Sequence, residues 1–166
     1  VAQQLYENGF ITYMRTDSTH LSDEAVKGSR HIVSDLFGDD FLPKSPNNYE
    51  TNVKNAQEAH EAIRPAHKIF KSIDTVSKKL GKDAGNLYDL IWKRTIASQM
   101  LPAKLKQTSV IISNADTDFR ASGQTIVFPG YMKIYVEGKD NPEAELANKE
   151  KILPEMSENE ILMCNQ

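Results

Sequence analysis

The hydrophobic pattern of this chain changes near Pro102, and that change constrains the fold more than any other feature. Before Pro102 the apolar residues recur at helical spacing, whereas from Leu105 onward they fall in short runs rich in β-branched and aromatic residues. A length of 166 residues with 39% hydrophobic residues suffices for one good core or two small ones. We therefore predict an α+β fold, with a helical domain over residues 1–104 and part of an antiparallel β domain over 105–166.

Local signals indicate where the helices begin and end. A first helix is already under way at the start of the sequence and ends at Gly9. A second begins after the N-cap residue Ser22 and ends at Gly38. A third runs over about 83–100. Any helix over 56–63 must end there, because the proline at position 65 disfavours helical geometry at the residue before it.

The remaining segments read as strands and loops. A short strand is expected at residues 10–13, followed by a polar loop over 14–19. Breaker-rich or acidic stretches without periodicity predict long loops at 43–56 and 137–150. The expected strands of the second half lie at 109–113, 119–122, 125–128, 131–136 and 161–164.

Charge and cysteine content exclude several classes of function. Twenty basic and 23 acidic residues give a net charge of −3, so composition alone does not indicate nucleic-acid binding. Any DNA-binding role must rest on specific residues. The single cysteine, Cys164, cannot form an internal disulfide or a thiolate metal site, which fits the cytoplasm. No apolar run approaches the ~18 residues that a bilayer span needs, so we expect no membrane partner.

The most informative stretch runs from Tyr13 to Ser18. In an extended segment Tyr13, Arg15 and Asp17 would share one face, with neighbours roughly 7 Å apart. Tyrosine can be a covalent nucleophile, but its pKa near 10 calls for a nearby cation such as Arg15. Asp17 could hold that arginine, and the hydroxyls of Thr16 and Ser18 could bond phosphate oxygens. The competing interpretation is a strand-to-loop junction with a core tyrosine and a weak surface ion pair.

A second group of candidate residues lies at 57–65. On a helical turn His60 and Arg64 would be neighbours, four residues apart, and both can donate to phosphate. The stretch 60–64 resembles the zinc-protease pattern His-Glu-x-x-His, but Arg64 in the fifth position cannot become a metal ligand. The alternative for His60 is a hydrogen-bonded, partly buried imidazole. The only basic cluster, Lys78, Lys79 and Lys82, is read as a solvated face.

These two stretches resemble signatures of one enzyme family. Residues 9–19, GFITYMRTDST, resemble the active-site segment of type IA DNA topoisomerases, and residues 57–65, QEAHEAIRP, resemble their second signature. Residues 87–94 and 99–103 are also similar to the helix that closes the family's tyrosine domain. Met14 favours bacterial DNA topoisomerase I over topoisomerase III. The resemblance is firm over 1–104, and the later β part is similar to the family's gate-arch domain.

The resemblance implies a mechanism and roles for the candidate residues. Tyr13 would attack single-stranded DNA, become joined to the 5′ phosphate and free a 3′ hydroxyl, and the reverse step would rejoin the strand. Negative supercoils would relax without ATP, because the phosphotyrosine conserves the bond energy. Arg15 would be catalytic with Tyr13, by stabilising transition-state charge. Contacts to DNA are expected from Arg15, Thr16, Asp17, Ser18, His60 and Arg64.

The resemblance also implies parts that these residues do not contain. In the family Mg²⁺ is bound by a separate toprim domain, so we expect no metal site in this fragment and Mg²⁺ only in a full-length enzyme. The chain looks like a central fragment, inactive alone, whose partners are single-stranded DNA and the missing toprim and other domains. The alternative is a non-catalytic DNA-binding or gate module, which an upstream sequence lacking the toprim acidic cluster would favour.

Overall fold

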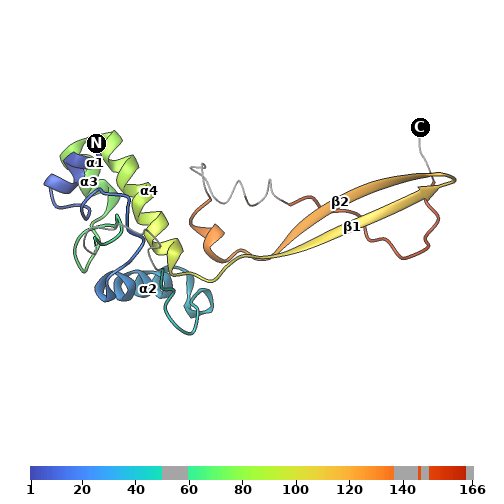
Figure 1. Cartoon of the computed structure of the whole chain (residues 1–166), viewed down its shortest axis with the longest axis horizontal. Coiled ribbons are helices and arrows are strands. Elements are labelled where there is room, and N and C mark those ends of the chain that lie inside the picture. Colours follow the sequence, from blue (N-terminus) through green and yellow to red (C-terminus); the bar gives the residue numbers. More distant parts are fainter. Residues whose placement is uncertain (50–59, 137–145, 147–149, 164–166) are drawn as a thin grey trace.

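The computed structural model describes residues 1–49, 60–136, 146 and 150–163, and its helices and strands occupy opposite ends of the molecule. Figure 1 shows the helices gathered at one end and a long hairpin extending away from them. The two strands pair antiparallel, which confirms the predicted α+β class. No helix of the described residues combines the length and apolar character needed to cross a bilayer.

The first two helices end where the sequence predicts. Helix α1 spans Ala2–Glu7, and the chain then turns at Gly9, whose φ of +72° suits glycine. Helix α2 spans Asp23–Phe37 and begins after Ser22, whose Oγ accepts from the Ala25 backbone N–H at 3.4 Å. The short η1, Asp39–Phe41, follows it.

Two further helices pack against each other. Helix α4 spans Lys82–Ser98, close to the predicted 83–100. Helix α3, Ile73–Leu80, has no counterpart among the predicted elements. The helix has only eight residues and one fully buried apolar side chain, Val76. A helix this short leaves too few apolar residues for a helical repeat to be recognised in the sequence.

Helix α4 joins two hydrophobic clusters. Its first half contributes Tyr88 to a cluster with Leu5 and Ile11, and its second half contributes Ile96 to a cluster with Val33. The Tyr88 hydroxyl donates to the Lys71 carbonyl at 2.9 Å, and burial raises the pKa of this phenol to about 12. The long helix therefore fixes both the tail of α1 and the middle of α2 on one scaffold.

The second half forms a single hairpin. Strands β1, Lys104–Asn114, and β2, Thr117–Phe128, pair from Lys104↔Phe128 to Asn114↔Thr117. Predicted runs 119–122 and 125–128 are thus one strand. The predicted strand at 131–136 is wrong, since η2, Gly130–Lys133, lies there. No strand forms at 161–163 either. Residue 164 and most of the predicted loop 137–150 lie outside the described residues.

The hairpin packs against little of the described chain. Ile111, Phe119 and Val127 are exposed by 57–67%. Contacts are made near Gly123, where a Cβ would lie 2.5 Å from the Lys151 carbonyl oxygen, and at Phe128, whose ring lies 4.9 Å from that of Phe41. Strand β1 begins at Lys104, where we predict the boundary between domains, and the division into two domains stays a prediction.

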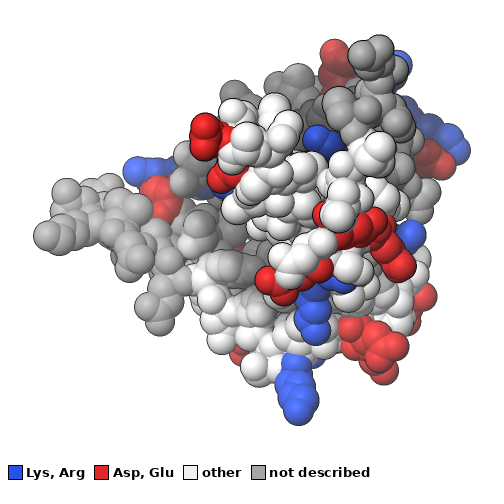
Figure 2. Space-filling view, turned by 90° about the vertical axis from the view of Figure 1, so that its right-hand side faces the viewer, with Lys and Arg blue, Asp and Glu red and all other residues white. Residues whose placement is uncertain are grey.

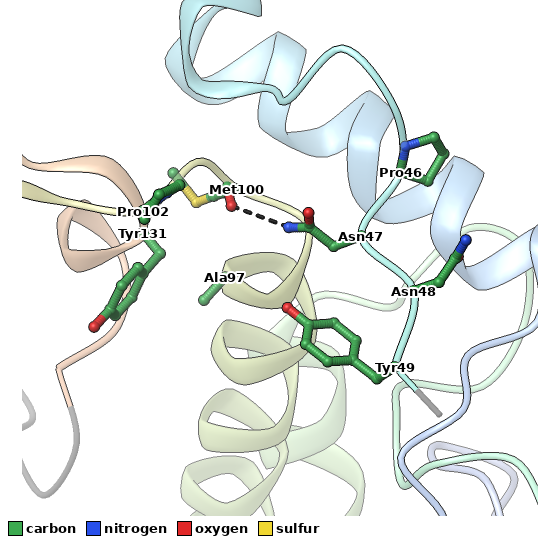
Figure 3. A pocket seen from close by; sticks show the side chains of 8 residues that line it. All are labelled: Pro46, Asn47, Asn48, Tyr49, Ala97, Met100, Pro102 and Tyr131. Carbon is green, nitrogen blue, oxygen red and sulfur yellow. Dashed lines mark hydrogen bonds between the residues drawn. The ribbon is translucent and has the colours of Figure 1, made fainter. Parts of the chain in front are cut away.

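Side chains of the loop at 46–49 hold the junction between α4 and β1. The Asn47 amide donates to the carbonyls of Ser98 at 2.9 Å and Met100 at 3.2 Å, the latter drawn in Figure 3. The buried Gln99 amide donates back to the Asn47 carbonyl at 3.0 Å, and the Leu101 N–H donates to the Phe41 carbonyl at 2.8 Å. The two bonds from Asn47 satisfy carbonyls at and just beyond the end of α4, which lack helical partners.

Candidate active site

Tyr13 lies in a polar segment just beyond the first hydrophobic cluster. Its side chain is 43% exposed, so the phenol faces solvent and is not a core residue. Its ring contacts Tyr6 edge-on, with centroids 5.2 Å apart, and lies 5.7 Å from the His60 ring. Two stretches that are 47 residues apart in sequence thus meet at this tyrosine.

Arg15 and Asp17 form the ion pair that the sequence pattern predicts. Arg15 Nε lies 2.9 Å from Asp17 Oδ2, and the arginine side chain is 49% exposed. An exposed pair of this kind adds little to stability. Its effect is to orient the guanidinium, two residues from Tyr13, where it remains accessible to an anion.

Residues 60–66 run antiparallel beside residues 10–12. The Thr12 N–H donates to the Arg64 carbonyl and the Arg64 N–H to Thr12 Oγ1, each at 2.9 Å. Ile11 and Pro65 form an isolated β-bridge, and no longer strand forms at the predicted 10–13. Residues 60–63 are not helical, so the condition set for a helix over 56–63 does not arise in this part, and residues 56–59 lie outside the described part.

The same segment also holds the far end of the tyrosine loop, by which we mean residues 12–22. The Ala62 N–H donates to the His20 carbonyl at 2.7 Å. The Ser22 N–H donates to Glu61 Oε1 at 2.9 Å. The loop that carries Tyr13 is therefore fixed at both ends by one short stretch, which limits the positions open to the phenol.

Arg64 lies in the interior of this arrangement. Its side chain is 9% exposed, and its Nε and Nη2 both donate to the Glu61 carboxylate. Nη1 donates to the Pro65 carbonyl at 2.8 Å, and Nη2 also reaches Ser22 Oγ at 3.3 Å. The structure thus brings His60 to Tyr13 but directs Arg64 away from it, so the shared helical face predicted for His60 and Arg64 is wrong.

The hydroxyls of the tyrosine loop border a cavity. Thr16, Ser18 and Thr19 line part of its wall, opposite residues of α4. Ser18 Oγ accepts from the His20 N–H at 3.2 Å. The DNA contacts expected from Thr16, Asp17 and Ser18 remain predictions. Two of these residues, Thr16 and Ser18, lie at the wall of the cavity.

Glu61 is the site residue that sequence reasoning missed. Burial raises the pKa of its carboxyl, but hydrogen bonds from Arg64 and Ser22 and the charge of Arg64 together outweigh it, so the pKa falls below the ordinary 4.5. The sequence did contain a signal for this pair, because Glu61 stands three residues before Arg64. Side chains at that spacing can form an ion pair even where the backbone is not helical.

The lowered pKa makes the stability of this pair depend on pH. A carboxylate with a lowered pKa stabilises the folded state above its ordinary pKa and stops doing so as the pH falls through the folded value. We expect the stability difference between the natural protein and Glu61→Gln to be largest above pH 4.5 and to shrink below it. Urea midpoints between pH 7 and 3 measure this, and an unchanging difference would contradict it.

The described residues form no group of metal ligands, and the face drawn in Figure 2 carries charges of both signs. Across the residues that the structure describes, no three His, Cys, Asp or Glu side chains gather as a metal-binding group. The face seen in Figure 2 carries basic and acidic side chains interspersed, with neither sign covering it alone.

Comparisons with known proteins agree on one family. The family model described as DNA topoisomerase matches residues 1–166. The chain is 49% identical to DNA topoisomerase 1 of Synechocystis over 166 residues and 51% identical to that of Streptomyces coelicolor over 171 residues. It spans 18% of each. The structure of full-length topoisomerase I from Thermotoga maritima matches 93% of this chain and 24% of its own, with TM-score 0.66 and 33% identity.

Proposed function

Because this chain belongs to the DNA topoisomerase family, whose model matches it over residues 1–166, we propose that it carries the nucleophile of a type IA enzyme of the bacterial topoisomerase I kind. Such an enzyme is an ATP-independent isomerase. It cuts one DNA strand, passes DNA through the break and rejoins the strand, which relaxes negative supercoils in the cytoplasm. The chain spans 18% of its curated relatives, so the activity is proposed for the natural-length protein.

One observation carries this proposal: Tyr13 is exposed and its ring lies 5.7 Å from that of His60. The two stretches that meet here are the two whose sequences resemble the family's signatures. A phenol with an accessible guanidinium in the same loop suits attack on a phosphodiester, because a cation stabilises both the phenolate and the charge of the transition state.

The residues of the candidate site have different parts in the proposed mechanism. The Tyr13 hydroxyl loses its proton and its oxygen attacks the phosphorus. The new O–P bond forms as the bond to the 3′ oxygen breaks, and that oxygen takes up a proton to become a 3′ hydroxyl. Arg15 binds the phosphate oxygens, oriented by Asp17. His60 contacts a neighbouring phosphate beside the tyrosine ring. Arg64 has a different part, since its guanidinium is engaged by Glu61, so we propose that it shapes the site and that DNA contact falls to the exposed residues.

Cleavage of a single-stranded oligonucleotide tests this proposal. A label on the 3′ end should remain with the protein after denaturation, and a label on the 5′ end should be released, because Tyr13 would hold the 5′ phosphate of the downstream fragment. The opposite distribution would contradict the proposed polarity. Oligonucleotide binding with no adduct under any condition would favour the alternative, a non-catalytic DNA-binding or gate module.

Residues 1–166 alone are expected not to relax a supercoiled plasmid in Mg²⁺. The reason is that we expect an enzyme of this kind to need Mg²⁺, whose ligands we place elsewhere in a longer protein. Plasmid relaxation followed on agarose gels measures this, with the natural-length protein as the positive control. Relaxation by residues 1–166 that Tyr13→Phe abolishes would show that the other parts are dispensable.

Arg15→Lys is expected to slow cleavage by about 100-fold or more while changing affinity little. Lysine keeps the positive charge but loses the planar fork that binds two phosphate oxygens at once. Loss of one preorganised donor to the transition state has an effect of this order. Single-turnover cleavage at saturating oligonucleotide measures the rate, and fluorescence anisotropy measures the affinity. A rate equal to that of the natural protein would remove Arg15 from the site.

A further inference from the structure

Two cavities meet along α4, next to the tyrosine loop. One has a volume of about 560 Å³ and the other about 400 Å³, and both are bordered by Tyr49, Ala97 and Tyr131. The larger reaches Thr16 in the tyrosine loop, while the smaller extends to Asn47 (Figure 3). We call the two together the α4 groove.

The described side chains that line the groove carry no negative charge that would repel a polyanion. None of the described lining residues is an aspartate or glutamate, although the chain has 23 of them. Arg94 supplies a positive charge, and its guanidinium lies 4.9 Å above the Tyr135 ring, which restrains it. Asn47 and Thr16 add an amide and a hydroxyl. A phosphodiester chain could therefore enter without facing a carboxylate of this wall.

Two aromatic rings border the groove. Tyr49 is 44% exposed and Tyr131 is 37% exposed, and Ala97 lies between them in the view of Figure 3. The Tyr49 hydroxyl donates to the Ser98 carbonyl at 2.8 Å, which holds its ring against the end of α4. Restrained, partly exposed aromatic rings beside a cation are the usual platforms on which bases of single-stranded nucleic acid stack.

We propose that the α4 groove binds the single-stranded DNA that flanks the phosphate at Tyr13, with bases on Tyr49 and Tyr131 and a phosphate at Arg94. The proposal rests on the proposed function, because it continues the same strand. The connection is direct: Thr16 and Ser18, within five residues of Tyr13, form one wall of the groove. If one phosphate of a DNA strand lies in the tyrosine loop, the nucleotides that follow it are therefore next to the α4 groove.

Photo-crosslinking tests where the strand runs. Oligonucleotides carry a single 5-iodouracil at successive positions on each side of the cleavage site and are irradiated with the natural-length protein. We expect crosslinks to Tyr49 or Tyr131 from a base within about four nucleotides of the cut phosphate, a span that suits a small single-strand site. Peptide mapping by mass spectrometry identifies them. Crosslinks confined to peptides outside the groove would overturn the proposal.

Substitutions test what the groove contributes to affinity. Tyr131→Ala is expected to weaken oligonucleotide binding about tenfold, while Tyr131→Phe, which keeps the ring, should bind as the natural protein does. Arg94→Gln should weaken binding and lower its salt dependence. Lys93→Gln is the matched control, since Lys93 is the adjacent cation of α4, pairs with Asp89 and does not line the groove. Natural affinity in Tyr131→Ala and Arg94→Gln would contradict the proposal.

The outcomes separate this inference from the proposed function. If Tyr13 forms its adduct but no crosslink maps to the groove, the groove proposal fails and the function stands. If crosslinks map to the groove while no adduct forms, the groove binds DNA and the catalytic proposal fails. Equal competition by a duplex of the same length would overturn the assignment to single strands.

Discussion

Tyr13→Phe is expected to abolish covalent adduct formation while oligonucleotide affinity stays unchanged. The substitution removes one oxygen and keeps the ring, so the contacts with Tyr6 and His60 persist. Without the oxygen no O–P bond can form, and the rate should fall to the background of the assay, a loss of several orders of magnitude. Adduct yield on denaturing gels and anisotropy with the same oligonucleotide measure the two properties.

Tyr6→Phe provides the matched control. Tyr6 is 42% exposed, close to the 43% of Tyr13, and its ring touches that of Tyr13. Removal of this neighbouring hydroxyl should leave the adduct yield within about twofold, since Tyr6 takes no part in the proposed chemistry. Full adduct formation by Tyr13→Phe would overturn the nucleophile assignment, whichever way the control behaves.

Arg64→Ala is expected to destabilise the tyrosine loop by about 3 kcal/mol. The substitution would leave the Glu61 carboxylate partly buried without its cation, and removal of one partner of a buried pair has an effect of this size. It would also remove the guanidinium donor that Ser22 Oγ and the Pro65 carbonyl accept from. Hydrogen exchange of the Thr12 and Ala62 amides measures the local effect, because both amides pair across this junction.

Two further variants serve as controls for the effect of Arg64→Ala on stability. Arg120→Ala removes an exposed arginine from β2, whose Nε–H donates to Ser109 Oγ at 3.0 Å, and should change stability by less than about 0.5 kcal/mol. Arg64→Lys keeps the charge but not the two-point contact with Glu61, so it should fall between the natural protein and Arg64→Ala. Unchanged exchange at Thr12 and Ala62 in Arg64→Ala would contradict the structural role.

The helices that the sequence predicted well are those whose local signals agree with their packing. Helix α2 has a serine cap at one end, a glycine at the other, and a complete apolar stripe between them. The strand predicted at Tyr131–Val136 is wrong because there the local signals disagree with the packing. Its β-branched and aromatic residues suit a strand, but the chain turns closely at Gly130, where a Cβ would collide with the Leu101 carbonyl oxygen, and η2 forms.

The candidate site was partly visible in the sequence for a similar reason. The ion pair between Arg15 and Asp17 depends on residues two apart, so local spacing could predict it. The role of Arg64 depends on Ser22, 42 residues away, and on a chain path over 60–64 that is not helical. Long-range pairing of this kind leaves no periodic trace, so the contact between Tyr13 and His60 could be expected only from the resemblance.

The hairpin acts mechanically as a lever arm. Strand β1 has 11 residues, which at the usual rise gives a length of about 37 Å. A rotation of only 10° at its base would therefore move the tip by about 6 Å. The bonds of Asn47 and Gln99 lie at that base, where forces applied at the far turn have their greatest leverage. The partly buried Asn47 amide and the buried Gln99 amide thus set how stiffly the hairpin follows the helical end of the molecule.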